Sequence, residues 1–343
     1  MELNIAYTTN DAYAKCTGIS ILSLFHNNQD ATSINVYVFI TDMSEVNQKR
    51  IMKIAMRYKR NIEIIDINTK LNKLASELGF EKMRGSYNTY VKLFVSHWIE
   101  SVDKVLFIDA DTLVVGSVSN YFNEELGNNI IAAVPDAGIY DKISEVESDE
   151  LINIGKKYFN AGVMLLNLKL WREENLDSYI SKKIKEYNGE WYNAEQSMLN
   201  YAFYDRCKYV HLRYNYYTPF HFQDYDKVSK YLDVKRAVSK MEYIEAKKAP
   251  AIIHFLGLPY VRPWYSKNLS PYKTIYMKYY KISPWGKTRL DDFPKNPQLS
   301  YRIYDYILFI AQKHKLYSLH NLIRSTFSGK IKSIIKQIVG TRK

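Results

Sequence analysis

The sequence predicts an α/β protein with a mostly parallel, Rossmann-like sheet and helices on both faces. Short apolar runs alternate with segments of helical periodicity, which is the pattern of repeated β-α-β units. The chain has 343 residues, of which 47% are hydrophobic, and this is enough for a large core in one or two domains. Neither of the common glycine-rich phosphate loops occurs, so a bound nucleotide diphosphate would need a metal and cations instead.

The expected elements follow from the apolar pattern in chain order. Strands are predicted from continuous apolar runs at residues 5–8, 36–40, 62–67, 105–108, 130–134 and 163–168. Helices are predicted from their apolar spacing at residues 10–27 and 87–98. A third helix is predicted to begin after an N-cap at Ser44.

Asp109 and Asp111 follow the apolar run at 105–108 directly, and Leu113 returns the chain to the interior. Two carboxylates at the mouth of a core strand are costly unless a cation neutralises them. A capped turn with solvated carboxylates is the simpler alternative. The position after a buried strand favours Mn²⁺ or Mg²⁺ bridging the phosphates of a nucleotide.

A second group of polar residues follows the apolar pair Ile252 and Ile253. His254 ends this predicted strand and could be a third metal ligand, although a lone histidine there is more often a core residue. Gly257 would allow close approach of the backbone to a phosphate, and Arg262 could clamp a diphosphate with a fixed cation.

Composition limits the compartment and the class of partner. Two cysteines form no disulfide framework, the first residues lack the features of a signal peptide, and no apolar run reaches a bilayer span. These features predict a cytoplasmic protein. The 31 tyrosines suit stacking on sugars, although compositional bias is an equal alternative.

The C-terminal extension, residues 269–343, is expected to differ from the rest of the chain. Beyond Asp305 it has no acidic residue and eight basic ones, interleaved with isoleucines at helical spacing. This pattern predicts docking on an anionic membrane surface, which would place the protein on the inner face of the cytoplasmic membrane. The alternative is a helix that closes the core. No nucleic-acid motif accompanies the charge, so no nucleic-acid partner is expected.

Five segments, in order, resemble glycosyltransferase family 8, the family of bacterial lipooligosaccharide galactosyl- and glucosyltransferases with glycogenin as a relative. They are residues 5–13, 104–112, 159–168, 195–200 and 254–264. The resemblance covers residues 1–268 and implies a GT-A catalytic domain there. It also implies a UDP-hexose donor, Mn²⁺, a glycan or glycolipid acceptor and retention of anomeric configuration.

The resemblance assigns roles by position. The implied metal ligands are Asp109, Asp111 and His254. The implied nucleoside contacts are Thr8, Asn10 and Tyr13. The implied neighbours of the donor sugar are Lys92, Asp136, Asn160 and Gln196, and the implied diphosphate contacts are Gly257 and Arg262.

Four positions depart from the family pattern. Asn10 stands where Asp is frequent, Lys92 where Arg is usual, and Glu195 where Asp is usual. Arg262 replaces a Lys and lies two residues further from Gly257. These departures bear on the identity of the donor sugar. The departures also leave open the alternative that the chain is a catalytically silent nucleotide-sugar-binding protein of the same fold. A nucleotidyltransferase also uses paired carboxylates, but segments 159–168 and 254–264 argue against it.

Retention requires either two inversions or attack from the front face. Two inversions need a nucleophile beneath the anomeric carbon, and Glu195 and Asp136 are the nearby carboxylates in the sequence. Front-face attack is favoured, with Gln196 supporting the oxocarbenium-like centre and the leaving phosphate accepting the proton. Acceptor specificity is expected to lie in residues 138–157.

Overall fold

The computed structural model describes residues 1–319 except 81, 83–85, 138–157, 187–193, 219, 230, 231, 233, 295–298, 317 and 318. The predicted acceptor segment and the basic part of the C-terminal extension therefore lie outside the described residues. The chain forms two compact units, one of Met1–Leu256 with Thr274–Thr288 and one of Gly257–Lys273 with Arg289–Lys343. The predicted boundary at residue 268 stays a prediction.

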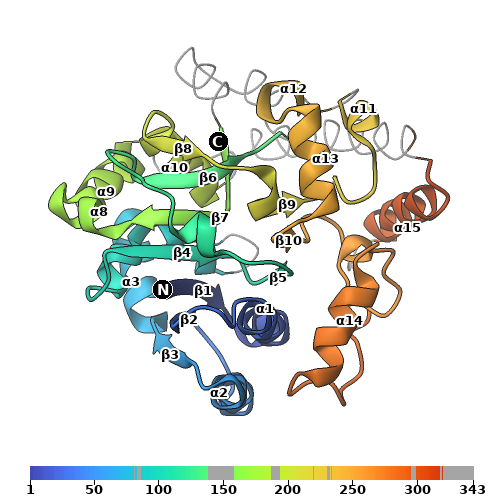
Figure 1. Cartoon of the computed structure of the whole chain (residues 1–343), viewed down its shortest axis with the longest axis horizontal. Coiled ribbons are helices and arrows are strands. Elements are labelled where there is room, and N and C mark those ends of the chain that lie inside the picture. The colour runs from blue at the N-terminus through green and yellow to red at the C-terminus, as the bar shows by residue number, and fades with distance from the viewer. Residues whose placement is uncertain are drawn as a thin grey trace. The chain divides into compact units, whose positions relative to one another are not determined.

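A seven-stranded sheet forms the centre of the first unit, in the order β3-β2-β1-β4-β7-β6-β8 (Figure 1). Its strands are β1 (Glu2–Thr9), β2 (Ser33–Ile40), β3 (Asn61–Asp66), β4 (Lys104–Ile108), β6 (Ile131–Pro135), β7 (Phe159–Asn167) and β8 (Cys207–Tyr209). The strands predicted from apolar runs are confirmed, and most of them are longer than predicted.

The sheet is mostly parallel, as predicted. Strands β1, β2, β3 and β4 pair in parallel, and so do β6 and β8. Strand β7 runs antiparallel to both of its neighbours, β4 and β6. Its nine residues are almost completely buried, which explains why a continuous apolar run rather than an alternating one marks it in the sequence.

Helices cover both faces of this sheet. Successive residues of a strand point to opposite sides, so a continuous apolar strand has apolar side chains on both faces, and helices bury them. On one face, Phe39, Phe107 and Met164 join a buried cluster with residues of α3 (Asn68–Leu78), α9 (Leu176–Glu186) and α10 (Ala194–Phe203). On the other face, the Tyr7 hydroxyl lies 3.1 Å from the hydroxyl of Ser20 in α1 (Ala14–Asn27).

Two predicted helices differ from the structure in their first turns. The helix predicted at 10–27 begins as a 3-10 turn, Asp11–Tyr13, because the Asn10 side chain accepts from the Tyr13 amide and caps it. The helix predicted at 87–98 is a 3-10 helix, Asn88–Phe94, followed by the short α4 (Val95–Trp98). The predicted N-cap is confirmed, because Ser44 accepts from Asn47 at the start of α2 (Glu45–Tyr58).

A second, three-stranded sheet brings distant segments of the first unit together. It contains β5 (Thr112–Val114), β10 (Ile252–His254) and β9 (Tyr216–Tyr217) in that order. Strand β10 pairs antiparallel with β5 and parallel with β9. His254 pairs with Thr112 on one side and Tyr217 on the other, so the ends of these strands share one edge.

Further helices are found among the described residues of the first unit. They are α5 (Ser119–Phe122), α8 (Leu168–Glu173), α11 (Tyr225–Val228), α12 (Val234–Ala237), α13 (Lys240–Lys248) and, except for its first residue, α14 (Lys273–Ile282). The segment after α14 packs on α1 and α2, because Trp285 occupies the space beside Gly18 of α1 and its ring nitrogen donates to Asn47 of α2.

The second unit contains a 3-10 turn, Pro259–Val261, and α15 (Leu299–Lys313). Phe309 of α15 meets the rings of Tyr260 and Phe293 edge-on, and Tyr265 forms a parallel bridge with Asp291. None of the helices in the described part of the chain is both long enough and apolar enough to cross a bilayer.

Candidate active site

The predicted metal ligands meet where the two sheets of the first unit adjoin. Asp109 follows β4, and its amide donates to the carbonyl of Gly162 at 2.8 Å. Asp111 precedes β5, and its carbonyl accepts from the amide of Phe255 at 2.9 Å. Backbone pairing with β7 and β10 therefore fixes the positions of both carboxylates and of His254.

The ligand atoms of these three residues converge. Nε2 of His254 lies 3.1 Å from Oδ1 of Asp111 and 3.9 Å from Oδ2 of Asp109. One ligand atom of each residue lies within 4.8 Å of the others, the one such group of three found among the described residues. Two carboxylate oxygens and an imidazole nitrogen are a donor set that suits Mn²⁺, and also Mg²⁺ when phosphate oxygens and water complete the shell.

Lys92 supplies a buried cation beside this group. Its side chain is 3% exposed, and Nζ lies 2.7 Å from Oδ1 of Asp109 and 3.4 Å from Oε1 of Glu195. Burial alone would lower the pKa of Lys92, but the two carboxylates outweigh it, and the pKa is raised. Burial raises the pKa of Asp109, and Lys92 opposes that rise. The lysine thus holds charge on a carboxylate that burial disfavours.

Asp136, Asn160 and Gln196 form the other side of the site. Oδ2 of Asp136 accepts from Nδ2 of Asn160 at 2.9 Å and from Nε2 of Gln196 at 3.0 Å. Oε1 of Gln196 accepts from the amide of Ala161 at 3.0 Å. All three side chains are buried, so these bonds hold them in a fixed orientation.

The predicted nucleoside contacts lie at the carboxyl end of β1, the neighbour of β4. Thr8 is within 3.5 Å of the carbonyl of Asn88, and Oδ1 of Asn10 accepts from the Tyr13 amide at 3.1 Å. In an open α/β sheet, ligands bind beyond the carboxyl ends of adjacent parallel strands. The assignment of these residues to the nucleoside stays a prediction.

Gly257 and Arg262 belong to the second unit. Gly257 has φ +100°, a backbone conformation that residues with a side chain rarely adopt, so this position requires glycine. The guanidinium of Arg262 lies over the ring of Trp264, 5.5 Å from its centre. Their assignment to the diphosphate stays a prediction.

Two residues of the site were not found from the sequence. Oδ1 of Asn215 lies 3.0 Å from Nδ1 of His254, and the Asn215 side chain is fully buried. The hydroxyl of Tyr217 donates to the carbonyl of Pro135 at 3.0 Å and accepts from the amide of Ala137 at 2.8 Å, which fixes the backbone on both sides of Asp136. Neither residue stands in a motif, and only the pairing of β9 with β10 brings them to the site.

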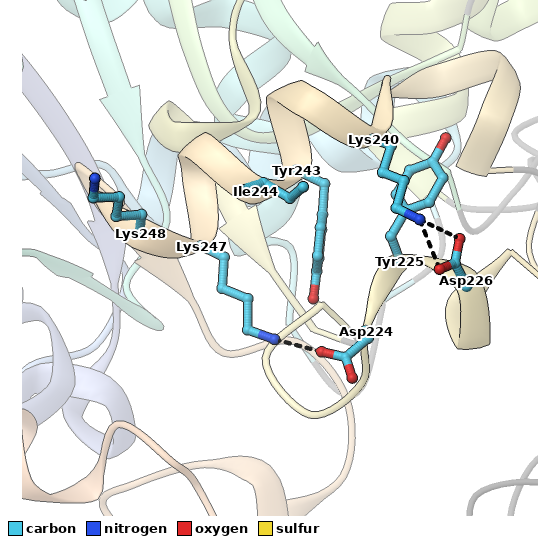
Figure 2. Close-up of a pocket in the computed structure, with 8 residues that line it drawn as sticks. All are labelled: Asp224, Tyr225, Asp226, Lys240, Tyr243, Ile244, Lys247 and Lys248. Atoms are coloured by element: carbon cyan, nitrogen blue, oxygen red, sulfur yellow. Dashed lines mark hydrogen bonds and ion pairs between the residues drawn. The ribbon is translucent and has the colours of Figure 1, made fainter.

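A hollow between α11 and α13 lies apart from these residues. Figure 2 shows two ion pairs that line it, Lys247 with Asp224 at 2.7 Å and Lys240 with Asp226 at 2.8 Å. No residue predicted for the site lines it. The charges of these two lysines and two aspartates are paired with one another, and Lys248 also lines the hollow.

The sheet order, the small second sheet and the carboxylate pair after β4 define the GT-A fold that the family resemblance implies. The structure superposes on the galactosyltransferase LgtC, solved in complex with donor and acceptor sugar analogues, with a TM-score of 0.66. The two share 25% sequence identity, and the match covers 83% of this chain and 96% of LgtC.

Two relatives match this chain over most of their own length. General stress protein A of Bacillus subtilis is 25% identical over 286 residues, 83% of this chain and 95% of the relative. Lipopolysaccharide 1,3-galactosyltransferase of Salmonella typhimurium is 25% identical over 307 residues, 88% of this chain and 84% of the relative.

The family model described as glycosyl transferase family 8 matches residues 4–268. The chain belongs to glycosyl transferase family 8. The predicted enzyme class, a hexosyltransferase, is confirmed.

Proposed function

We propose that this enzyme transfers glucose or galactose, with retention, from a UDP-sugar to a glycan acceptor in the synthesis of lipopolysaccharide or another cell-surface glycan. The observation that carries the proposal is the convergence of Asp109, Asp111 and His254 at the end of β4. The similarity to lipopolysaccharide galactosyl- and glucosyltransferases supports the type of sugar and acceptor.

Asp109, Asp111 and His254 would hold Mn²⁺, for which their oxygen and nitrogen donors are suited. When bound, the ion would stabilise negative charge on the leaving diphosphate. Lys92 holds Asp109 in place through the 2.7 Å ion pair and opposes the rise in the pKa of Asp109 that burial causes. Thr8, Asn10 and Tyr13 bind the nucleoside, and Gly257 and Arg262 bind the diphosphate.

The buried polar network orients the donor sugar. Asp136 accepts from two amide groups, and this leaves a rigid carboxylate that can accept from a sugar hydroxyl. Gln196 is tied to Ala161 and Asp136, so its dipole is preorganised rather than mobile. Glu195 is engaged with Lys92 at 3.4 Å, which makes it a poor nucleophile. These contacts favour front-face attack, in which the leaving phosphate takes the proton of the acceptor.

A panel of nucleotide sugars tests the donor. With Mn²⁺, UDP-glucose or UDP-galactose is expected to raise the melting temperature, because saturation at 100 times Kd stabilises a protein by about 2.7 kcal/mol. UDP release should require Mn²⁺ and stop with EDTA. Asp111→Asn should lose both effects, whereas Asp30→Asn, a change at an exposed aspartate, should keep them.

Two results would count against this function. If no UDP-sugar stabilises the enzyme with Mn²⁺, the donor class is wrong. If a UDP-sugar stabilises it but neither hydrolysis nor transfer to truncated lipopolysaccharide acceptors follows, the chain is instead a silent nucleotide-sugar-binding protein.

The C-terminal extension would dock this enzyme on the cytoplasmic membrane surface. Its eight basic residues beyond Asp305 support this location, at about 1 kcal/mol for each cation close to an anionic surface. In α15, the side chains of Tyr306 and Ile307 are 64% and 43% exposed. Full-length protein should float with vesicles that contain phosphatidylglycerol. Changing Lys330, Lys332 and Lys336 together to Glu should abolish flotation. Absence of flotation of the wild-type protein would refute docking, and equal flotation of both proteins would refute the role of these lysines.

A further inference from the structure

A chain of buried amides leads from the sugar side of the site to the metal side. It consists of Asn160, which is 3% exposed, and Asn215, which is fully buried. At one end lies the carboxylate of Asp136, and at the other lies His254, which is 1% exposed. Each link is a hydrogen bond of 3.0 Å or less. The direction of these bonds decides which nitrogen of His254 carries a proton.

The first link has a fixed direction. A backbone N–H can only donate, and the amide of Gly162 lies 3.0 Å from Oδ1 of Asn160. The other end of the Asn160 amide donates from Nδ2 to Asp136 at 2.9 Å. Two independent partners therefore agree that the oxygen of Asn160 faces away from Asp136.

The direction passes on to His254. Because Oδ1 of Asn160 can only accept, Asn215 must turn Nδ2 toward it, at 2.8 Å. Oδ1 of Asn215 then faces Nδ1 of His254 at 3.0 Å, so Nδ1 must donate. In the neutral imidazole, Nε2 is left with its lone pair aimed at Asp111, 3.1 Å away.

We infer that Asn215 is a positioning residue for metal binding, which holds His254 in the Nδ1–H tautomer and presents Nε2 as a ligand. The inference rests on the metal site of the proposed function. Without this acceptor, the imidazole would place its proton on Nε2 and donate to the carboxylate of Asp111. That proton would block the coordination position, and a metal would have to displace it first.

Two substitutions separate this role from simple packing. Asn215→Leu has a similar shape but cannot accept from Nδ1, so it should weaken Mn²⁺ binding by ~10- to 100-fold. Asn215→Asp keeps an acceptor toward His254 in either protonation state, and when protonated it also keeps a donor toward Asn160. This variant should bind Mn²⁺ within about threefold of wild type. The threefold bound is well below the ~10-fold minimum for loss of such a partner.

The readouts are direct binding of Mn²⁺, measured by electron paramagnetic resonance of the free ion, and the tautomer. In metal-free protein at pH 9, ¹⁵N spectra of labelled histidines, with His254 assigned by its loss in His254→Gln, should show Nδ1–H in wild type and Asn215→Asp. Asn215→Leu should show Nε2–H. Asn28→Leu is the matched control, because Asn28 is a fully buried amide whose partners, the amide of Val118 and the carbonyl of Leu24, do not belong to the site.

Equal Mn²⁺ affinity of Asn215→Leu and Asn28→Leu would overturn the inference, as would Nε2–H in wild type. Equal losses in Asn215→Leu and Asn215→Asp would also overturn it, because packing alone would then explain the effect. Failure of the wild-type protein to bind Mn²⁺ would instead refute the metal site of the proposed function, and the metal-free tautomer would still be measurable.

Discussion

Gly162 lies against the imidazole ring of His254, so closely that a methyl group on its Cα would stand 2.7 Å from Nδ1 and collide with Cε1. The glycine is in the middle of β7, where the side chain of any other residue would push the histidine away from Asp109 and Asp111. The space that the His254 ring occupies is therefore set by the absence of a side chain on a neighbouring strand.

Gly162→Ala should displace His254 and weaken Mn²⁺ binding by ~10-fold or more, since the ligand can no longer point at the carboxylates. Overpacking should also cost about 1–3 kcal/mol of stability. Isothermal titration with Mn²⁺ and urea unfolding measure the two effects. Gly79→Ala is the control, because it strains a left-handed helix end but meets nothing within 4 Å. An unchanged Mn²⁺ affinity in Gly162→Ala would show that the ring is not held by this contact.

Gln196→Ala should lower turnover strongly while donor binding survives. The amide of Gln196 holds Asp136 and Ala161, so its loss frees a carboxylate that would otherwise be rigid in the transition state. A loss of ~10² to 10³-fold in kcat is expected for such a preorganised group. UDP release and calorimetric binding of the donor separate the two quantities, with Gln48→Ala on α2 as the control. Unchanged turnover would exclude this role.

Lys92→Met should destabilise the protein by about 3–5 kcal/mol, because it leaves two carboxylates without their buried cation. Adding Glu195→Gln, or saturating Mn²⁺, should recover part of the loss. Urea unfolding with and without Mn²⁺ measures this. Lys49→Met breaks an ion pair whose side chains are 73% and 84% exposed, so it should change stability by less than about 1 kcal/mol. Similar losses in the two variants would contradict the prediction.

His221 should make the protein less stable in mild acid. Burial lowers its pKa from 6.5 to about 3, so between these values the unfolded chain binds a proton that the folded chain does not. Stability is therefore lost as pH falls. Between pH 7 and pH 5 the loss should be about 2 kcal/mol. Urea unfolding should show a smaller loss in His221→Gln, and His97→Gln, a change at an exposed histidine, should keep the wild-type slope.

Most of the sheet was predictable because its central strands β4, β6 and β7 are buried on both faces and read as continuous apolar runs. The edge strand β8 has one buried residue of three and was not predicted. The carboxylate pair after β4 was predictable for the same reason, since charge directly after a buried strand is conspicuous. The 3-10 helix Asn88–Phe94 was not, because its apolar residues follow a spacing that suits an α-helix equally well.

The network behind His254 could not be read from the sequence at all. Asn215 and Tyr217 reach the site only because β9 pairs with β10, and no local pattern encodes that pairing. Lys92 was predicted to contact the donor. Its ion pairs with Asp109 and Glu195 were not predicted, because both residues come from other elements of the fold. Long-range partners of this kind depend on the whole fold rather than on any segment.

The distance along the chain between Asp111 and His254 has a consequence for biosynthesis. The two residues are separated by 143 positions, so a ribosome working at about 5–20 residues per second makes the carboxylates roughly 7–30 seconds before the histidine. Lys92 is translated before both aspartates and pairs with Asp109 in the finished protein. A growing chain thus contains a neutralising partner for its first carboxylate before the imidazole exists, and the group of Asp109, Asp111 and His254 is completed only after β10 has been made.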